Sequence, residues 1–198
     1  MGREDERRLD GDAIVAGFET MGRYLRERGS VGEIAVYGGT AILLQFDWRT
    51  ITQDVDAVVS AGGREDLVKD AAAYAGLLHD LPPEWLNNFV GGFTPLTERS
   101  EFFSAFGSYP SGEAPGLRVK LARPEYLCAM KLKALERADP QDKDFQDAVR
   151  LARETGVTDP EELNRMYADF FPDEDLPPIA QVRLPEVAAE AAAPGTAP

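Results

Sequence analysis

Cysteine and histidine are nearly absent from this sequence, which holds one residue of each among 198. A single cysteine excludes an internal disulfide framework and any metal site built from several thiolates. A single histidine excludes the paired-histidine zinc motifs. No apolar run approaches the roughly 20 residues that a membrane helix requires. We therefore expect no disulfide scaffold, no cysteine or histidine metal centre, and no attachment to a membrane.

Basic residues are also scarce, because 21 Lys and Arg stand against 35 Asp and Glu, giving a formal net charge of −14. This balance argues against broad adhesion to nucleic acid or to an anionic membrane, although one local basic groove stays compatible with it. The charged N-terminal stretch MGREDERRLDGD lacks the apolar core of a secretory signal. We therefore expect a protein of the reducing cytoplasm.

Hydrophobic periodicity and turn residues predict an α/β (α+β) chain in three parts. The first part, residues 1–122, begins with an amphipathic helix and continues as the core. The second, residues 123–172, is a helical subdomain that starts at Pro124, a residue suited to the first turn of a helix. The third, residues 173–198, is rich in proline and alanine and is expected to be largely disordered.

Within these parts the expected strands are short and the expected helices carry ordinary start and stop signals. The stretch 84–116 combines aromatic with turn residues, so we expect short strands and loops there. The elements predicted elsewhere are helices over 12–28, 40–46, 64–78, 125–137, 140–154 and from Pro160, and strands over 34–37, 55–59 and 117–121.

Two aspartates flank the first residue of the strand predicted over 55–59. Side chains two positions apart on a strand share a face, so Asp54 and Asp56 should project together, about 7 Å apart along the chain. Two neighbouring carboxylates repel each other, and a divalent cation relieves the repulsion. Mg²⁺ favours one or two carboxylates together with substrate phosphates. Asp54 and Asp56 are therefore candidate ligands of Mg²⁺ or Mn²⁺.

Gly38 and Gly39 end the strand predicted over 34–37, where they allow a close approach of the backbone to a ligand. Taken alone, a Gly-Gly pair is usually a turn, and an Asp-x-Asp pair often sits at the end of a strand. The order strand, Gly-Gly, helix, strand and Asp-x-Asp within 26 residues is more specific. Arg49 adds a guanidinium that suits a phosphate, or that pairs at the surface with Asp47 or Asp54.

These residues carry a resemblance to a known superfamily. The run Val-Tyr-Gly-Gly-Thr-Ala from Val36, followed by Arg49, Thr52 and Asp54-Val55-Asp56, resembles the nucleotidyltransferases of the DNA polymerase β type. The closer likeness, over about 30–172, is to the bacterial branch of AbiEii-like toxins and DUF6036 nucleotidyltransferases. It rests on Trp85-Leu86-Asn87, on the Pro-Glu-Tyr-Leu…Ala-Met-Lys-Leu segment 124–134, and on Asp144 with Asp147.

The resemblance implies a polymerase-β-type core with a short mixed sheet, a C-terminal helical subdomain, and an active site in the cleft between them. It implies transfer of a nucleoside monophosphate from an NTP, with Mg²⁺ or Mn²⁺. An RNA or tRNA end, a protein hydroxyl or a small molecule is the acceptor, and a toxin or antitoxin is a further expected partner. The residues that it assigns are catalytic Asp54, Asp56, Lys131 and Asp144, and nucleotide-binding Gly38, Gly39, Thr40, Arg49 and Thr52.

Lys131 occupies an apolar stripe, because it shares a helix face with Leu127 and Leu135 at intervals of four residues. A lysine there either extends its ammonium to solvent or pairs with an anion. Acids at Asp144 and Asp147 would by themselves favour the start of a helix electrostatically. The resemblance implies that Asp144 belongs to the site and that Asp147 supports it.

One departure from the superfamily concerns the third carboxylate that usually activates the attacking hydroxyl. The strand expected to supply it, 117–121, carries Arg118 and Lys120 instead. Glu98 and Glu101 are substitutes that nothing local distinguishes. This departure leaves an alternative open, in which the chain is a non-catalytic module of the same fold that binds an NTP or a partner.

Overall fold

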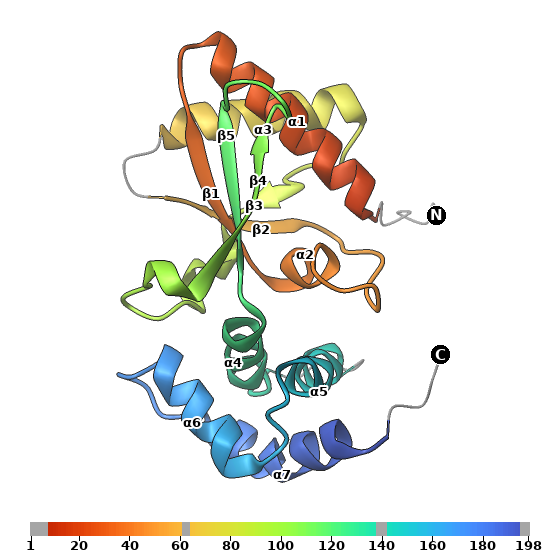
Figure 1. Ribbon diagram of the computed structural model, residues 1–198, viewed down its shortest axis with the longest axis vertical. Helices are drawn as coiled ribbons and strands as arrows, with labels where there is room; N and C mark the ends of the chain where they lie inside the picture. The colour runs from red at the N-terminus through yellow and green to blue at the C-terminus, as the bar shows by residue number, and fades with distance from the viewer. Residues whose placement is uncertain (1–7, 61–63, 138–141, 195–198) are drawn as a thin grey trace, which may run out of the picture. The chain divides into compact units, whose positions relative to one another are not determined.

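The computed structural model describes residues 8–60, 64–137 and 142–194 (Figure 1). The chain divides into two compact units. The first, called the sheet unit, comprises Met1–Gly92 and Phe103–Ala122. The second, called the helical unit, comprises Phe93–Phe102 and Arg123–Pro198, so it takes in a short segment that the sequence analysis grouped with the core.

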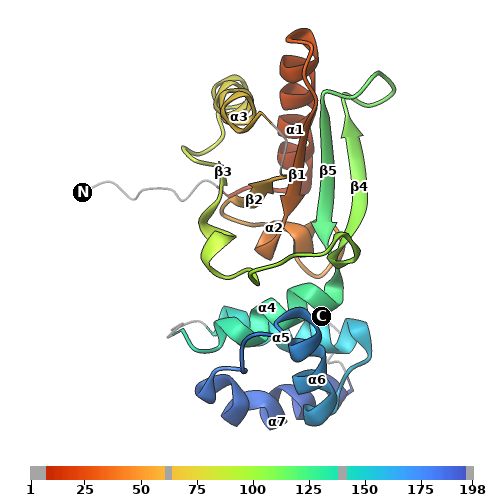
Figure 2. The same cartoon turned by 90° about the vertical axis from the view of Figure 1, so that its left-hand side faces the viewer.

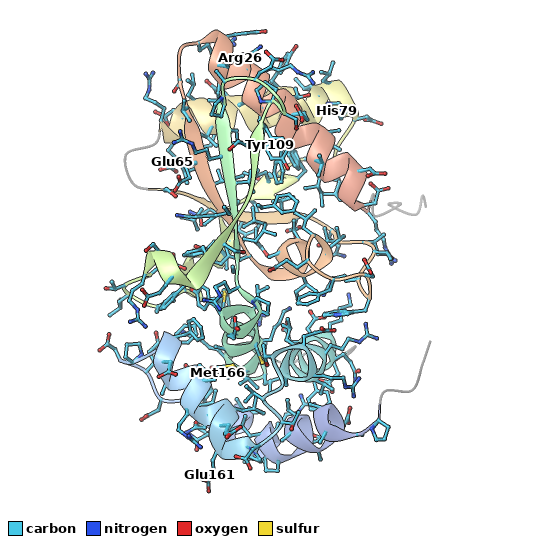
Figure 3. All side chains as sticks on the ribbon, in the orientation of Figure 1. Arg26, Glu65, His79, Tyr109, Glu161 and Met166 are labelled. Carbon is cyan, nitrogen blue, oxygen red and sulfur yellow. The ribbon has the colours of Figure 1, made fainter. Side chains whose placement is uncertain are left out.

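The sheet unit is built on a mixed sheet of five strands in the order β3-β2-β1-β5-β4, which Figure 2 shows side by side. The pairs β1–β5 and β2–β3 are parallel, whereas β1–β2 and β4–β5 are antiparallel. The expected α/β class with a short mixed sheet is confirmed. The strands are β1 (Gly32–Val36), β2 (Val55–Val59), β3 (Leu86–Asn87), β4 (Phe103–Tyr109) and β5 (Leu117–Ala122).

One face of the sheet is apolar and lies under two helices, α1 (Gly11–Glu27) and α3 (Glu65–His79). A β-carbon on Gly32 of β1 would lie 2.8 Å from Cγ2 of Val68 in α3 and 3.2 Å from Cδ1 of Leu25 in α1. Side chains alternate between the faces of a strand, so the opposite face receives the charged residues of β1, β2 and β5. Those residues are Glu33, Asp56, Arg118 and Lys120.

Helix α1 lies one residue earlier at each end than the predicted helix over 12–28. The Asp10 side chain caps it by accepting the backbone N–H of Ala13 at 2.8 Å. Its buried face carries apolar residues three or four positions apart, and the chain leaves the helix through Gly29, whose φ is +64°. The short helix α2 (Gly38–Leu43) follows β1 directly, two residues earlier than expected.

Trp85 fixes the approach to β3. Its indole is buried, and Nε1 donates to the backbone oxygen of Ala72 at 2.9 Å. Glycines on both helices make room for the ring, since a β-carbon on Gly17 would be 2.6 Å from Cη2 and one on Gly76 would be 3.2 Å from Cδ1. Trp85 therefore packs against α1 and α3 and holds the following residues at the sheet edge.

The helical unit contains α4 (Pro124–Ala134), α5 (Lys143–Thr155), α6 (Pro160–Phe170) and α7 (Pro178–Ala192). Helix α6 starts as predicted, with Asp159 accepting the backbone N–H groups of Glu161 and Glu162. The helix expected over 140–154 begins instead at Lys143, and its first expected residues lie outside the described residues. In the described part of the chain, no helix is long and apolar enough to span a membrane.

The expectation of a largely disordered tail from residue 173 is wrong over α7. Leu184, Val187, Ala188 and Ala191 are buried at the spacing of one helix face. Arg183 ties the helix to α5 through two hydrogen bonds to the Asp142 carboxylate, at 2.9 and 2.7 Å. The abundance of alanine and proline obscured this stripe, because the compositional argument does not consider spacing.

Candidate active site

The turn between β1 and α2 is built against a carboxylate. Gly38 has a φ of +57°, a left-handed conformation that residues with a β-carbon rarely adopt. A β-carbon on Gly38 would lie 2.8 Å from Oδ2 of Asp56. The backbone N–H of Tyr37 donates to the backbone oxygen of Asp56 at 2.9 Å. Glycine is therefore required here both by the backbone angle and by the neighbouring carboxylate.

Asp54 and Asp56 flank a buried residue, as the sequence predicts. Val55 is fully buried and Ala57 is 3% exposed, whereas both aspartates are partly exposed. The backbone of Asp54 is held from two sides, because its oxygen accepts from Oγ1 of Thr40 at 2.6 Å and from Oγ1 of Thr52 at 3.3 Å. The two carboxylates thus project from a segment with a fixed backbone.

Arg49 and Thr52 lie beside Gly39. A β-carbon on Gly39 would be 2.9 Å from Oγ1 of Thr52 and 3.4 Å from Cζ of Arg49. Thr52 is anchored in turn by reciprocal backbone hydrogen bonds with Leu9, at 2.8 and 2.9 Å. The structure therefore brings together, in the sheet unit, all seven site residues predicted for it: Gly38, Gly39, Thr40, Arg49, Thr52, Asp54 and Asp56.

The donor set at this position is two carboxylates. Among the residues that the structure describes, no group of three or more His, Cys, Asp or Glu side chains is arranged to hold a metal ion. Mg²⁺ is usually bound by one or two carboxylates with water and substrate phosphates, rather than by an all-protein cage. The chemistry of Asp54 and Asp56 therefore fits a divalent cation that arrives with a nucleotide.

The strand expected to supply a third carboxylate, β5, presents a cation that is already paired. Nζ of Lys120 lies 3.0 Å from Oε1 of Glu33 on the neighbouring strand β1, and 5.1 Å from the ring centre of Phe103. The hydrogen bond from Lys120, with a second from Ser60, lowers the pKa of the Glu33 carboxyl. On β5, the strand expected to carry an acid, this face of the sheet therefore presents a lysine that is paired with Glu33.

The other two candidates for that carboxylate belong to the helical unit and have partners there. Oε1 of Glu98 accepts from the Tyr126 hydroxyl at 2.7 Å. Glu101 forms an ion pair with Arg99 at 3.1 Å. Neither shows a feature that marks it as the acceptor-activating residue.

Lys131 and Asp144 meet in the helical unit, where α4 packs on α5. Nζ of Lys131 lies 2.7 Å from Oδ1 of Asp144 and 2.9 Å from Oδ2 of Asp147. The three side chains are only 15%, 16% and 9% exposed. Arg137 also pairs with Asp144, at 2.9 Å. Of the two interpretations of Lys131, pairing with an anion is therefore the one realised, and Asp147 shares that role with Asp144.

The predicted site residues thus form two clusters, one in each unit. Joint action of Lys131 and Asp144 with the aspartates of the sheet unit stays a prediction.

Asn87 is a site neighbour to which the sequence analysis assigned no role. Its Nδ2 donates to Oδ2 of Asp54 at 2.9 Å. The two residues are 33 positions apart, and only the pairing of β3 with β2 brings them together. The only signal in the sequence was the place of Asn87 in the Trp-Leu-Asn run.

Comparison of the chain with protein-family models, with curated proteins and with solved structures found no significant match.

Proposed function

We propose that this protein is a metal-dependent nucleotidyltransferase of the polymerase β type, which transfers a nucleoside monophosphate from an NTP to an acceptor hydroxyl. The observation that carries the proposal is the close approach of Gly38 to the carboxylate of Asp56, with Asp54 two residues away. A turn without side chains next to two partly exposed carboxylates suits a phosphorylated ligand that brings its own cation.

The residues around this turn have separate tasks in the proposed reaction. Gly38 lets the Asp56 carboxylate lie against the backbone of the turn, and Gly39 does the same for Thr52 and Arg49. Arg49, next to Gly39, offers a planar guanidinium that can bind two phosphate oxygens at once. Asp54 and Asp56 would hold Mg²⁺ or Mn²⁺, which when bound neutralises charge on the triphosphate and its leaving group.

In the transfer itself, the acceptor oxygen forms a bond to the α-phosphorus, the bond from that phosphorus to the bridging oxygen breaks, and pyrophosphate leaves. The acceptor hydroxyl releases its proton to water as the new bond forms. The resemblance assigns Lys131 and Asp144 to the catalytic set, and the acceptor is an RNA or tRNA end, a protein hydroxyl or a small molecule. A toxin or antitoxin partner belongs to the same proposal.

A second candidate is a non-catalytic module of the same fold that binds an NTP or a partner protein. The presence of Lys120 on β5 favours it, because the resemblance places the acceptor-activating acid on this strand and the lysine is already paired with Glu33. Both candidates can bind a nucleotide, but only the first transfers the nucleoside monophosphate to an acceptor.

Incubation with each α-³²P-labelled NTP, Mg²⁺ and a cell extract separates them. The proposal predicts label in an RNA, protein or small-molecule fraction, and loss of that label with Asp54→Asn. The matched control is Asp70→Asn, which removes the same charge from the exposed surface of α3. Binding of an NTP without transfer of label to any fraction would favour the non-catalytic module.

A further inference from the structure

We propose that Asn87 is a positioning residue that orients the Asp54 carboxylate for a divalent cation. The inference rests on the proposed function, because it assigns a task at the same metal site. It gives the Trp-Leu-Asn run a physical role.

The Asn87 amide is held at both ends. Its Nδ2 donates to Oδ2 of Asp54 at 2.9 Å, and its Oδ1 accepts the backbone N–H of Phe89 at 2.9 Å. Only the oxygen of an amide can accept from a backbone N–H. The contact with Phe89 therefore fixes which end of the amide faces Asp54, and that end is the donor.

The pairing of β3 with β2 fixes the position of Asn87 relative to Asp54 and Asp56. Strand β3 runs parallel to β2, with Leu86 opposite Val55 and Asn87 opposite Asp56. The backbone N–H of Val55 donates to the backbone oxygen of Trp85 at 2.6 Å. A slip of one residue would turn the Asn87 side chain to the other face of the sheet. The buried Trp85 opposes such a slip, so a strand of only two residues can present its amide reliably.

In this arrangement the two oxygens of the Asp54 carboxylate have different partners. Oδ2 is occupied by the amide, and Oδ1 can bind a cation without rotation of the carboxylate. A neutral donor suits this position, because a lysine would compete with the cation and an acid would repel the carboxylate. Partners that orient a metal ligand in this way typically account for roughly 10- to 100-fold in metal affinity.

The test measures Mn²⁺ binding to the full chain by electron paramagnetic resonance, in the presence of a non-hydrolysable ATP analogue. Asn87→Ala removes the amide, and Asn87→Leu keeps a side chain of similar size that has no hydrogen-bond donor and no charge. The matched control is Asn88→Ala, at the exposed neighbouring position. We expect the dissociation constant for Mn²⁺ to rise at least about tenfold in both Asn87 variants and to stay unchanged in the control.

Metal-free melting temperatures distinguish positioning from a merely structural role. We expect Asn87→Ala to melt close to Asn88→Ala without metal while still losing Mn²⁺ affinity. If Asn87→Ala does not fold, Asn87→Leu decides the matter by the same pair of measurements. Mn²⁺ affinity equal to that of the unmodified protein in a folded Asn87 variant would overturn the inference, as would a loss of affinity that only follows a lowered metal-free melting temperature.

Asp54→Asn, measured in parallel, separates failure of this inference from failure of the proposed function. Loss of Mn²⁺ binding in Asp54→Asn but not in either Asn87 variant would leave the metal site standing and overturn only the role of Asn87. Unchanged Mn²⁺ binding in Asp54→Asn would overturn the metal site and the inference together.

Discussion

The main chain at Gly38 approaches the carboxylate of Asp56 so closely that a single added carbon would lie 2.8 Å from Oδ2. A contact this short cannot persist, so either the turn or the carboxylate must move when a side chain is introduced. Backbone conformation and candidate chemistry are therefore coupled at one position, which makes Gly38 a direct probe of the site.

Replacement of this residue in Gly38→Ala should both destabilise the fold and displace Asp56. The left-handed backbone alone costs about 1–2 kcal/mol for a residue with a β-carbon. The matched control is Gly29→Ala, because Gly29 has a φ of +64° but nothing within 4 Å of its β-carbon position. Both variants should lower the free energy of unfolding in urea, but only Gly38→Ala should weaken Mn²⁺ binding with an ATP analogue. Equal Mn²⁺ binding in the two variants would contradict the assignment of Asp56.

The Lys131 ammonium should stabilise the helical unit, because it neutralises two carboxylates that are largely shielded from water. Lys131→Met keeps the aliphatic stem and leaves Asp144 and Asp147 without this cation. Removal of one partner from a well-buried ion pair costs about 3–5 kcal/mol. Partial exposure and the second partner of Asp144, Arg137, reduce the expected loss to about 2 kcal/mol. Urea unfolding followed by circular dichroism measures it.

A comparison within the same helix is provided by Lys133→Met. Lys133 pairs with Glu174, which is 38% exposed, and lies 4.6 Å from the ring centre of Phe171. Its loss should cost less than about 1 kcal/mol, as for other pairs near the surface. A smaller loss of stability for Lys131→Met than for Lys133→Met would contradict the expected stabilisation by the Lys131 ion pairs with Asp144 and Asp147. The same two variants test whether Lys131 affects transfer.

The Glu33–Lys120 pair should make stability depend on pH in the acid range. Because Lys120 and Ser60 lower the pKa of the Glu33 carboxyl from its ordinary value of 4.5, the folded state favours the ionised form. The resulting stabilisation is fully present above pH 4.5 and disappears as the pH falls through the lowered pKa. The Glu33 side chain is 41% exposed, so the contribution is below about 1 kcal/mol. Glu33→Gln should therefore be less stable than the unmodified protein at pH 7 and equal to it near the acid limit of folding.

The Cys128 thiol should be unreactive in the folded protein. Burial, with a smaller contribution from the charge of Glu125, raises its pKa to about 12. Thiolate is the reactive form of cysteine, so both access and ionisation are suppressed. Labelling by 5,5′-dithiobis(2-nitrobenzoic acid) at pH 8 should proceed at the rate of unfolding and become rapid in denaturant. Fast labelling without denaturant would mean that α4 opens readily.

Local sequence signals are sufficient to predict the helices that begin at a strong capping residue. The Asp159-Pro160 start of α6 and the Asp10 cap of α1 act within four residues, so the sequence contains all of their partners. The bounds of strands β3 and β4 could not be predicted within the stretch 84–116, because each strand forms only by pairing with a partner that is distant in the sequence. Leu86 pairs with Val55, and Phe103 pairs with Ala122.

The same distinction applies to the candidate site. Gly38, Asp54 and Asp56 could be grouped from their order and spacing, because Gly38 follows β1 and the two aspartates lie at the start of β2, the next strand along the chain. The hydrogen bond from Asn87 to Asp54 could not, since it requires the register of a two-residue strand. The pairing of Lys131 with both Asp144 and Asp147 was open in the sequence, where helix periodicity fixed the face of Lys131 but not the helix that packs beside it.

Helix α7 has a practical consequence for anyone who produces this protein. Its alanine- and proline-rich composition suggests that this end of the chain could be truncated. However, α7 contacts both ends of α5. Arg183 binds Asp142 just before α5 and lies 4.2 Å from the ring centre of Phe145, and Arg153 in the last turn donates to the backbone oxygen of Glu190 at 2.7 Å. A recombinant chain shortened to about residue 172 would expose the apolar surface that α7 covers, and aggregation during purification is the expected outcome.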